Sequence, residues 1–152
     1  MKNHLLVNNI IPIASDHAGF EAKELVKKIL KERDFTTIDY GTKSDESVDY
    51  PDFATLVAQA VNNGDHELGI LICGSGQGMC MTANKYPKVR ASLAWNEEVA
   101  KLSRQHNNAN VLCLPGRFLD EDELRSIVTS WLEASFEGGR HQRRVDKIEQ
   151  KQ

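Results

Sequence analysis

Leu68-Gly-Ile-Leu-Ile-Cys-Gly-Ser-Gly-Gln-Gly-Met79 is the stretch that decides the fold of this 152-residue chain. Its first half is a short, continuous apolar run, which is typical of a strand buried on both faces of a parallel sheet. In its second half Gly74, Gly76 and Gly78 alternate with polar residues, so the backbone can turn sharply and approach a ligand closely. A helix after this loop would point its first amides back at the strand end and form an anion site. Cys73 stands where the strand becomes the loop, and a thiol there is expected to ionise more readily than a free one.

The same stretch also has a purely structural interpretation, in which none of its residues is catalytic. Buried cysteines are common core residues, and glycine-rich turns follow strands in many α/β proteins. The glycines do not form a phosphate-binding P-loop, because no Lys-Ser or Lys-Thr follows them. They do not form a dinucleotide fingerprint either, because they follow the third predicted strand rather than the first. The stretch alone therefore predicts strand, turn and helix, and leaves open whether Cys73 is catalytic.

Length and composition limit the class of protein. A chain of 152 residues suits a single domain, 1–152, with a core of its own. The net charge of −3 argues against a nucleic-acid partner, which would favour a positive excess. Three cysteines without a CxxC pair indicate neither a disulfide framework nor a zinc ribbon, and favour a reducing, cytoplasmic location. No apolar run is long enough to span a membrane, and the histidines lack the HExxH or CxxC company of a metal site.

Apolar periodicity divides the chain into alternating strands and helices. Strands are predicted at residues 10–14, 35–40, 68–73, 89–95 and 109–114. Helices are predicted to include residues 22–30, 53–61, 82–85, 97–105 and 124–136, and Gly138-Gly139 breaks the last of them. Pro12 predicts that the first strand is irregular or close to a sheet edge. The alternation predicts a three-layer α/β sandwich, with a Rossmann-like, five-stranded parallel sheet and helices on both faces.

Sheets of this kind bind ligands at the carboxyl ends of their strands, which gives the scattered polar residues a meeting point. Asp16 and His17 follow the first predicted strand, Cys73 ends the third, and Arg117 follows the fifth. His106 instead precedes the fifth strand, so it is expected at the opposite edge and needs a second subunit to join the others. Each polar candidate also has a simpler interpretation: Asp16 as a helix cap, and His106 as a solvated helix end.

A set of motifs in order, rather than any single motif, resembles a known family. The motifs are Ser-Asp-His-Ala-Gly at 15–19, Asp-Tyr-Pro at 49–51, Cys-Gly-Ser-Gly-Gln-Gly at 73–78, Ala-Asn-Lys at 83–85, Arg-Gln-His-Asn at 104–107, Gly-Arg at 116–117 and Gly-Gly-Arg-His-Gln-Arg-Arg at 138–144. From about residue 11 to about residue 148 the chain resembles type B ribose-5-phosphate isomerase. The resemblance implies interconversion of ribose 5-phosphate and ribulose 5-phosphate in the pentose phosphate pathway, without a cofactor or a metal. It also implies a homodimer, or a dimer of dimers, with active sites shared between subunits.

The resemblance implies roles for individual residues as well. Cys73 matches the family's base, Ser75 the hydroxyl that relays a proton at O1 or O2, and His106 with Asp16 the pair that opens the sugar ring. The implied substrate-binding residues are His17, Tyr50, Gly74, Gly76, Gly78, Asn107, Arg117, Arg140, His141 and Arg144. The glycine amides match the anion hole for the enediolate, and the last arginines belong to a tail from about 138 that completes the site or the dimer. One branch of the family has a glutamate where this chain has Met79, so Cys73 assigns the chain to the cysteine branch.

Three alternatives stay open from the sequence. Allose 6-phosphate or galactose 6-phosphate as substrate would need a longer distance from Cys73 to the arginines. A non-catalytic phosphate-binding module, in which Cys73 is only a core residue, is an alternative of a different class. A thiol redox role would need Cys80 close to Cys73, because no CxxC motif supplies a resolving cysteine.

Overall fold

Five short apolar or β-branched runs form the strands of one parallel sheet. In the computed structural model, which describes residues 8–150, the strands are β1 (Ile10–Ser15), β2 (Thr36–Asp39), β3 (Gly69–Cys73), β4 (Ala91–Leu93) and β5 (Val111–Pro115). Their order across the sheet is β2-β1-β3-β5-β4, and every neighbouring pair is parallel. The parallel sheet predicted from the sequence is therefore confirmed.

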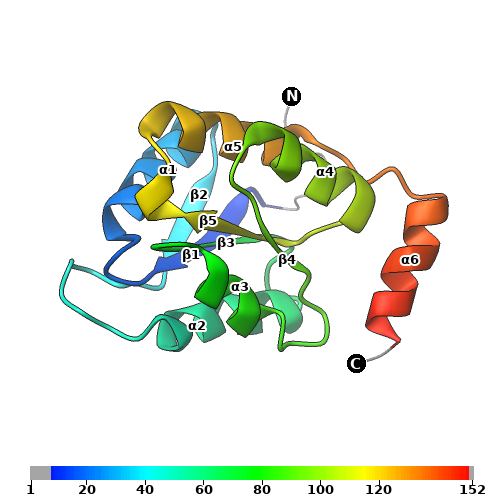
Figure 1. The fold of residues 1–152 in the computed structure, drawn as a ribbon, viewed down its shortest axis with the longest axis horizontal. Coiled ribbons are helices and arrows are strands. Elements are labelled where there is room, and N and C mark those ends of the chain that lie inside the picture. The colour runs from blue at the N-terminus through cyan, green and yellow to red at the C-terminus, as the bar shows by residue number, and fades with distance from the viewer. Residues whose placement is uncertain (1–7, 151–152) are drawn as a thin grey trace.

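Helices cover both faces of this sheet (Figure 1). One face carries α1 (Phe20–Glu32), α4 (Glu97–Asn107) and α5 (Glu121–Glu133), and the other carries α2 (Tyr50–Asn62) and α3 (Gln77–Ala83). Side chains alternate along each strand, so that Ile70 and Ile72 pack with α1 and α5, whereas Leu71 and Cys73 pack with α2 and α3. The molecule thus has two apolar cores, one on each side of the sheet. Within residues 8–150, no helix has the length and apolar character that crossing a membrane requires.

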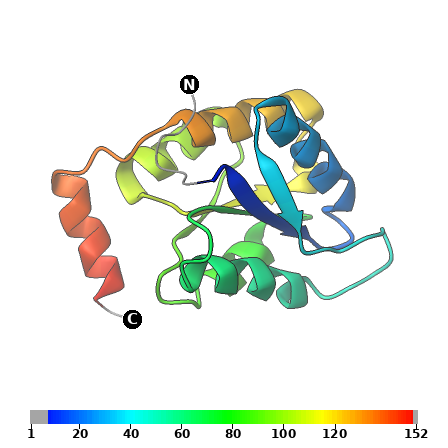
Figure 2. The same ribbon diagram turned by 180° about the vertical axis from the view of Figure 1, so that it is seen from behind.

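The last helix, α6 (Arg140–Glu149), leaves this body. Figures 1 and 2 show it at one end of the molecule, away from the helical layers. Gly138 and Gly139 precede it with φ angles of +70° and +58°, which side chains rarely adopt, and they redirect the chain after α5. Of the residues of α6, His141 and Val145 are buried and Glu149 is half-buried, whereas the others are exposed.

The structure refines two local predictions. Pro12 predicted a first strand that is irregular or close to a sheet edge, and β1 is a regular strand next to the edge strand β2. The strand tolerates Pro12 because its pairing with β3 begins only at Ile13. The final predicted helix is also shorter than expected, because α5 ends at Glu133 and leaves Phe136 outside it.

The chain order reverses between β1 and β3. β1 has β2 as its outer neighbour, whereas β5 and β4 extend the sheet beyond β3. Parallel sheets bind ligands in the crevice at the carboxyl ends of the two strands that flank such a reversal. Asp16 directly follows β1 and Cys73 ends β3, so the topology brings both residues to this position.

Candidate active site

The thiol of Cys73 lies under a loop that folds back over it. Cys73 is buried on the face covered by α2 and α3, and its Sγ accepts the backbone N–H of Gly76 at 3.2 Å. Gly76 has a φ of +76°, and a Cβ there would lie 2.5 Å from Leu93 Cδ1, so both conformation and space require glycine. Ser75 is exposed at the tip of the loop, where its Oγ accepts the N–H of Gln77 at 3.4 Å.

The helix after this loop begins earlier than the sequence suggested. α3 starts at Gln77, directly after Gly76, and ends at Ala83, whereas the sequence indicated a helix around residues 82–85. Gly76 is its N-cap residue, and its left-handed φ turns the chain from the strand end straight into the helix. Gly78 therefore belongs to the first turn of the helix rather than to a free loop.

Asp16 and His17 close the same edge from the end of β1. Asp16 is buried, its N–H donates to Ile72 O at 3.3 Å, and its carboxylate accepts the N–H of Gly19 at 3.0 Å. The Nδ1 of His17 accepts the N–H of Val48 at 3.2 Å, which ties the loop before α2 to this edge. Asp16 thus fixes the turn before α1 and lies beside the end of β3, but it is not the helix cap of its simpler interpretation, because Gly19 is the N-cap residue and no side chain caps α1.

Tyr50 and Arg117 border the glycine loop from two other elements. Tyr50 opens α2 and packs against Gly78 so closely that a Cβ on Gly78 would lie 2.2 Å from the tyrosine ring. Arg117 belongs to a short 3-10 helix after β5, and its backbone N–H donates to Gly74 O at 3.1 Å. Its guanidinium would lie 3.2 Å from a Cβ on Gly74. A side chain at either glycine would therefore displace a predicted substrate-binding residue.

His106 and Asn107 lie at the opposite edge of the sheet, in the last turn of α4 before β5 begins. The His106 ring stacks on His141 of α6, with ring centroids 4.3 Å apart and planes 8° apart. Oε1 of Glu137 lies 3.8 Å from Nε2 of His106 and 3.5 Å from Nε2 of His141. Burial lowers the pKa of His141, and the neighbouring His106 lowers it further. Two exposed arginines of α6 belong to the same end of the molecule, Arg140 and Arg144.

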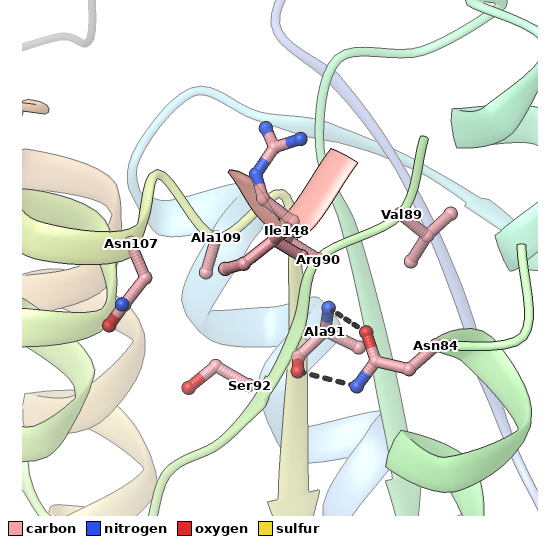
Figure 3. A pocket seen from close by; sticks show the side chains of 8 residues that line it. All are labelled: Asn84, Val89, Arg90, Ala91, Ser92, Asn107, Ala109 and Ile148. Atoms are coloured by element: carbon pink, nitrogen blue, oxygen red, sulfur yellow. Dashed lines mark hydrogen bonds between the residues drawn. The ribbon is translucent and has the colours of Figure 1, made fainter. Parts of the chain in front are cut away.

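A cavity of about 420 Å³ opens beside this second cluster (Figure 3). Its lining includes residues of β4, Asn107 of α4 and Ile148 of α6. The side chain of Asn84 holds both backbone polar groups of Ala91, accepting its N–H at 2.8 Å and donating to its carbonyl at 2.9 Å. This pairing covers part of the edge that β4 would otherwise expose. Arg90 Nη1 pairs with Glu149 at 2.6 Å, so an ion pair anchors the far end of α6 near the cavity.

The predicted site residues therefore form two groups within one chain. The group at the carboxyl edge contains Asp16, His17, Tyr50, Cys73, Gly74, Ser75, Gly76, Gly78 and Arg117. The group beyond the amino end of β5 contains His106, Asn107, Arg140, His141 and Arg144. His106 lies away from Cys73, as its position before the fifth strand predicted. Sequence reasoning missed Glu137, because no spacing motif links it to the two histidines and only the packing of α6 brings them together.

The other two cysteines pack on the same face as Cys73. Burial raises the pKa of Cys113 well above its usual value, and a hydrogen bond with Cys113 lowers the pKa of Cys80. The Cys80 thiol also donates to Ala91 O at 3.3 Å. The Cys80 thiol is therefore hydrogen-bonded to the backbone of β4.

Comparison with known proteins extends these observations. The family model described as Ribose/Galactose Isomerase matches residues 11–148. A probable ribose-5-phosphate isomerase B of Mycoplasma genitalium is 54% identical over 138 residues, which cover 90% of this chain and 91% of the relative. Ribose-5-phosphate isomerase B of Escherichia coli is 45% identical over 138 residues, with 91% and 93% covered. The crystal structure of ribose-5-phosphate isomerase B from Mycoplasma genitalium with bound ribulose 5-phosphate matches at 52% identity with a TM-score of 0.89, covering 93% of this chain and 95% of that one.

Proposed function

Since the chain belongs to the ribose/galactose isomerase family, we propose that it interconverts ribose 5-phosphate and ribulose 5-phosphate, with Cys73 as the base. The family resemblance inferred from the motifs is thereby confirmed. The observation that carries the proposal for the base is the position of the thiol. It ends β3 at the reversal of strand order, and it accepts the N–H of Gly76. A crystal structure of a relative with bound ribulose 5-phosphate, which has the same fold, supports a pentose phosphate as the substrate.

The reaction moves one hydrogen between C1 and C2 of the open-chain sugar. The thiolate of Cys73 takes the proton from C2, the C2–H electrons form the C1=C2 bond, and O1 acquires the negative charge. A proton then moves to O1 from O2, for which Ser75 is the relay. C1 finally takes the proton back from the Cys73 thiol, which leaves the carbonyl at C2. Because the N–H of Gly76 already binds the sulfur, stabilisation of the enediolate falls to the neighbouring loop amides and to Arg117.

The second group of residues supplies ring opening and phosphate binding. His106 takes the proton of the O1 hydroxyl and returns one to the ring oxygen, with Asp16 as its partner across the site. Arg140 and Arg144 stand at i and i+4 on α6, both exposed, so two guanidiniums lie on one helix face. Such a pair suits the oxygens of a phosphate group.

A complete site needs both groups, and one chain separates them. The strands between the two edges are about five residues long, so the edges are roughly 16 Å apart at the usual rise per residue. A pentose phosphate is too short to bridge that distance. The complete site therefore forms between two protomers of a homodimer. Large apolar side chains at the carboxyl edge support such an interface, since Trp95 is 55% and Phe118 72% exposed.

The direct test is an assay of purified protein, without added metal, that follows ketose formation from ribose 5-phosphate. Cys73→Ala is expected to lower turnover by roughly 10²- to 10⁴-fold. Cys80→Ala, which removes a thiol from the same core, should keep near-normal turnover. A Cys73→Ala variant with normal turnover would remove the thiol from the mechanism, and a folded, inactive wild type would refute the isomerase activity. Allose 6-phosphate in the same assay tests the longer substrate.

Mixed dimers test whether the site is shared. Cys73→Ala protein is refolded together with an Arg140→Ala/Arg144→Ala double variant and assayed at low ribose 5-phosphate. With shared sites, half of the random dimers are hybrids and each hybrid has one intact site, so about one quarter of wild-type activity should appear. A site built within one chain predicts no activity beyond the mean of the two variants.

A further inference from the structure

Three potential metal ligands meet where α6 joins α4. Nε2 of His106 and Nε2 of His141 lie 3.8 and 3.5 Å from one oxygen of Glu137, and the ligand atoms of the three residues all lie within 4.8 Å of one another. In a tetrahedral zinc site with bonds of about 2.1 Å, ligand atoms are about 3.4 Å apart. Two edges of the triangle are thus already close to the length that zinc needs. Among residues 8–150 this is the only cluster of three histidine, cysteine or acidic side chains so arranged.

Backbone contacts hold this triangle together independently of the three side chains. The N–H of Glu137 donates to Gln105 O at 3.0 Å, which ties Glu137 to the last turn of α4, where His106 lies. The N–H of His141 donates to Gly138 O at 3.0 Å at the start of α6. His141 is only 7% exposed, so packing fixes its ring against the body. Ligands on anchored elements lose little freedom when they bind an ion.

From this geometry we propose that His106, Glu137 and His141 bind a zinc ion, and that zinc bound there inhibits the isomerase. Two imidazoles and one carboxylate are a donor set found in zinc sites that keep a fourth position open. Mg²⁺, by contrast, prefers an all-oxygen environment and gains little from imidazoles. The two rings stack nearly parallel, so one ring must turn about its Cβ–Cγ bond to aim its lone pair at the ion. The His106 side chain is 40% exposed, and it is the ring that turns.

Inhibition follows because the ion takes the imidazole lone pair that ring opening uses. This consequence rests on the proposed role of His106, whereas binding of the ion does not. The ion also adds a second tie between α6 and the rest of the chain, next to the Arg90–Glu149 ion pair at 2.6 Å. Zinc should therefore raise the melting temperature of the protein as well as lower its turnover.

Binding is measured first, by competition with a chromophoric zinc chelator on metal-stripped wild type, Glu137→Gln and Asp146→Asn. Asp146 is a matched control, because it is an exposed acid of α6 whose Oδ1 accepts a hydrogen bond from Gln142 at 2.7 Å. Wild type and Asp146→Asn should bind one zinc per chain. Glu137→Gln should bind it at least about tenfold more weakly, since removing even an outer partner of a zinc ligand typically costs 10- to 100-fold. Excess Mg²⁺ should not compete.

Co²⁺ in place of zinc reports the ligand type, because thiolate ligands add an intense near-ultraviolet band that nitrogen and oxygen ligands lack. The expected spectrum has no such band. A thiolate band, or equal zinc affinity in wild type and Glu137→Gln, would overturn the site. His141→Asn provides a second binding variant, and circular dichroism checks that each variant is folded.

Activity is measured second, with ribose 5-phosphate and with zinc at a concentration that saturates wild type but not Glu137→Gln in the binding experiment. Zinc should abolish turnover of wild type and Asp146→Asn, and chelator should restore it. Glu137→Gln, whose turnover without zinc should match wild type, should resist the ion. Normal binding with unchanged turnover would overturn the inhibition but not the site. Absence of turnover in all zinc-free proteins would instead count against the proposed isomerase function.

Discussion

Replacing Asp39 with asparagine is expected to destabilise the fold by about 3 kcal/mol at neutral pH. Asp39 balances the charge of Lys23, whose side chain is completely buried and whose Nζ donates to Asp39 Oδ1 at 2.7 Å and to Thr42 O at 2.6 Å. Asparagine keeps the shape and the Oδ1 that accepts the N–H of Gly41 at 2.8 Å, but it puts an amide nitrogen where Oδ2 accepts a hydrogen bond from Lys27 Nζ at 2.8 Å, so the change removes the charge together with the Lys27 contact. Breaking a buried pair costs about 3–5 kcal/mol, and the lower end applies because the Asp39 side chain is 24% exposed.

The pH dependence of this loss follows from the pKa of Asp39. Burial acts to raise that pKa, but hydrogen bonds from Lys23, Lys27 and the Gly41 N–H bring it below the usual 3.8. A carboxyl with a lowered pKa in the folded state stabilises the fold above its unfolded pKa, and this contribution is lost as pH falls through the folded pKa. The stability difference between wild type and Asp39→Asn should therefore be constant above about pH 5 and shrink below about pH 4.

Urea denaturation followed by circular dichroism measures the difference, at one fixed protein concentration because an oligomer's stability depends on it. Asp45→Asn removes an exposed acid from the loop before α2 and should change stability by less than about 0.5 kcal/mol. A loss below about 1 kcal/mol for Asp39→Asn at pH 7, or a difference that persists undiminished into acid, would refute the buried-pair argument. Because the N–H of Thr42 donates to Ser15 O at 2.7 Å, the variant should also raise KM by loosening the edge that carries Asp16.

Three further predictions concern the site. Gly76→Ala should lose at least about 1 kcal/mol in urea denaturation through its positive φ alone, and more through contact with the Leu114 backbone, 3.0 Å from the new Cβ. Gly64 is the control: its φ is +81°, but a Cβ there would meet no atom within 4 Å. Equal losses of stability in Gly76→Ala and Gly64→Ala would therefore contradict a steric contribution at Gly76. Arg144→Ala should raise KM more than it lowers kcat in the ribose 5-phosphate assay, because a phosphate contact acts on ground state and transition state alike; a mainly kcat effect would contradict this. His106→Asn should lose more kcat/KM with ribose 5-phosphate than with D-erythrose 4-phosphate, which cannot close a furanose ring, and equal losses would argue against ring opening.

Burial explains why so much of the fold could be predicted from the sequence. β3 and β5 are buried along their whole length, so they appear as continuous apolar runs, and α1 and α2 show one apolar face each. Pro12 correctly indicated a strand close to an edge, since β1 lies next to the edge strand β2, but β1 is regular because its pairing with β3 begins only after the proline, at Ile13. The start of α3 was missed because the left-handed Gly76 begins the helix, and glycine-rich composition hides such a start.

Only part of the candidate site could be predicted in the same way. Position along the chain decides the sheet edge at which a residue lies, but it does not decide which residues it contacts there. Asp16 and Arg117 follow strands and Cys73 ends one, so parallel topology alone brings them to the same edge. The contact of His106 with His141 depends on how α6 packs on α4 after two glycines with positive φ, and no local pattern carries that information. One packing arrangement thus has two effects: it buries His141 against His106, and it leaves Arg140 and Arg144 of α6 exposed. In the proposed dimer, α6 is therefore the element through which one protomer completes the site of the other, and an ion that fixes α6 to α4 acts directly on that element.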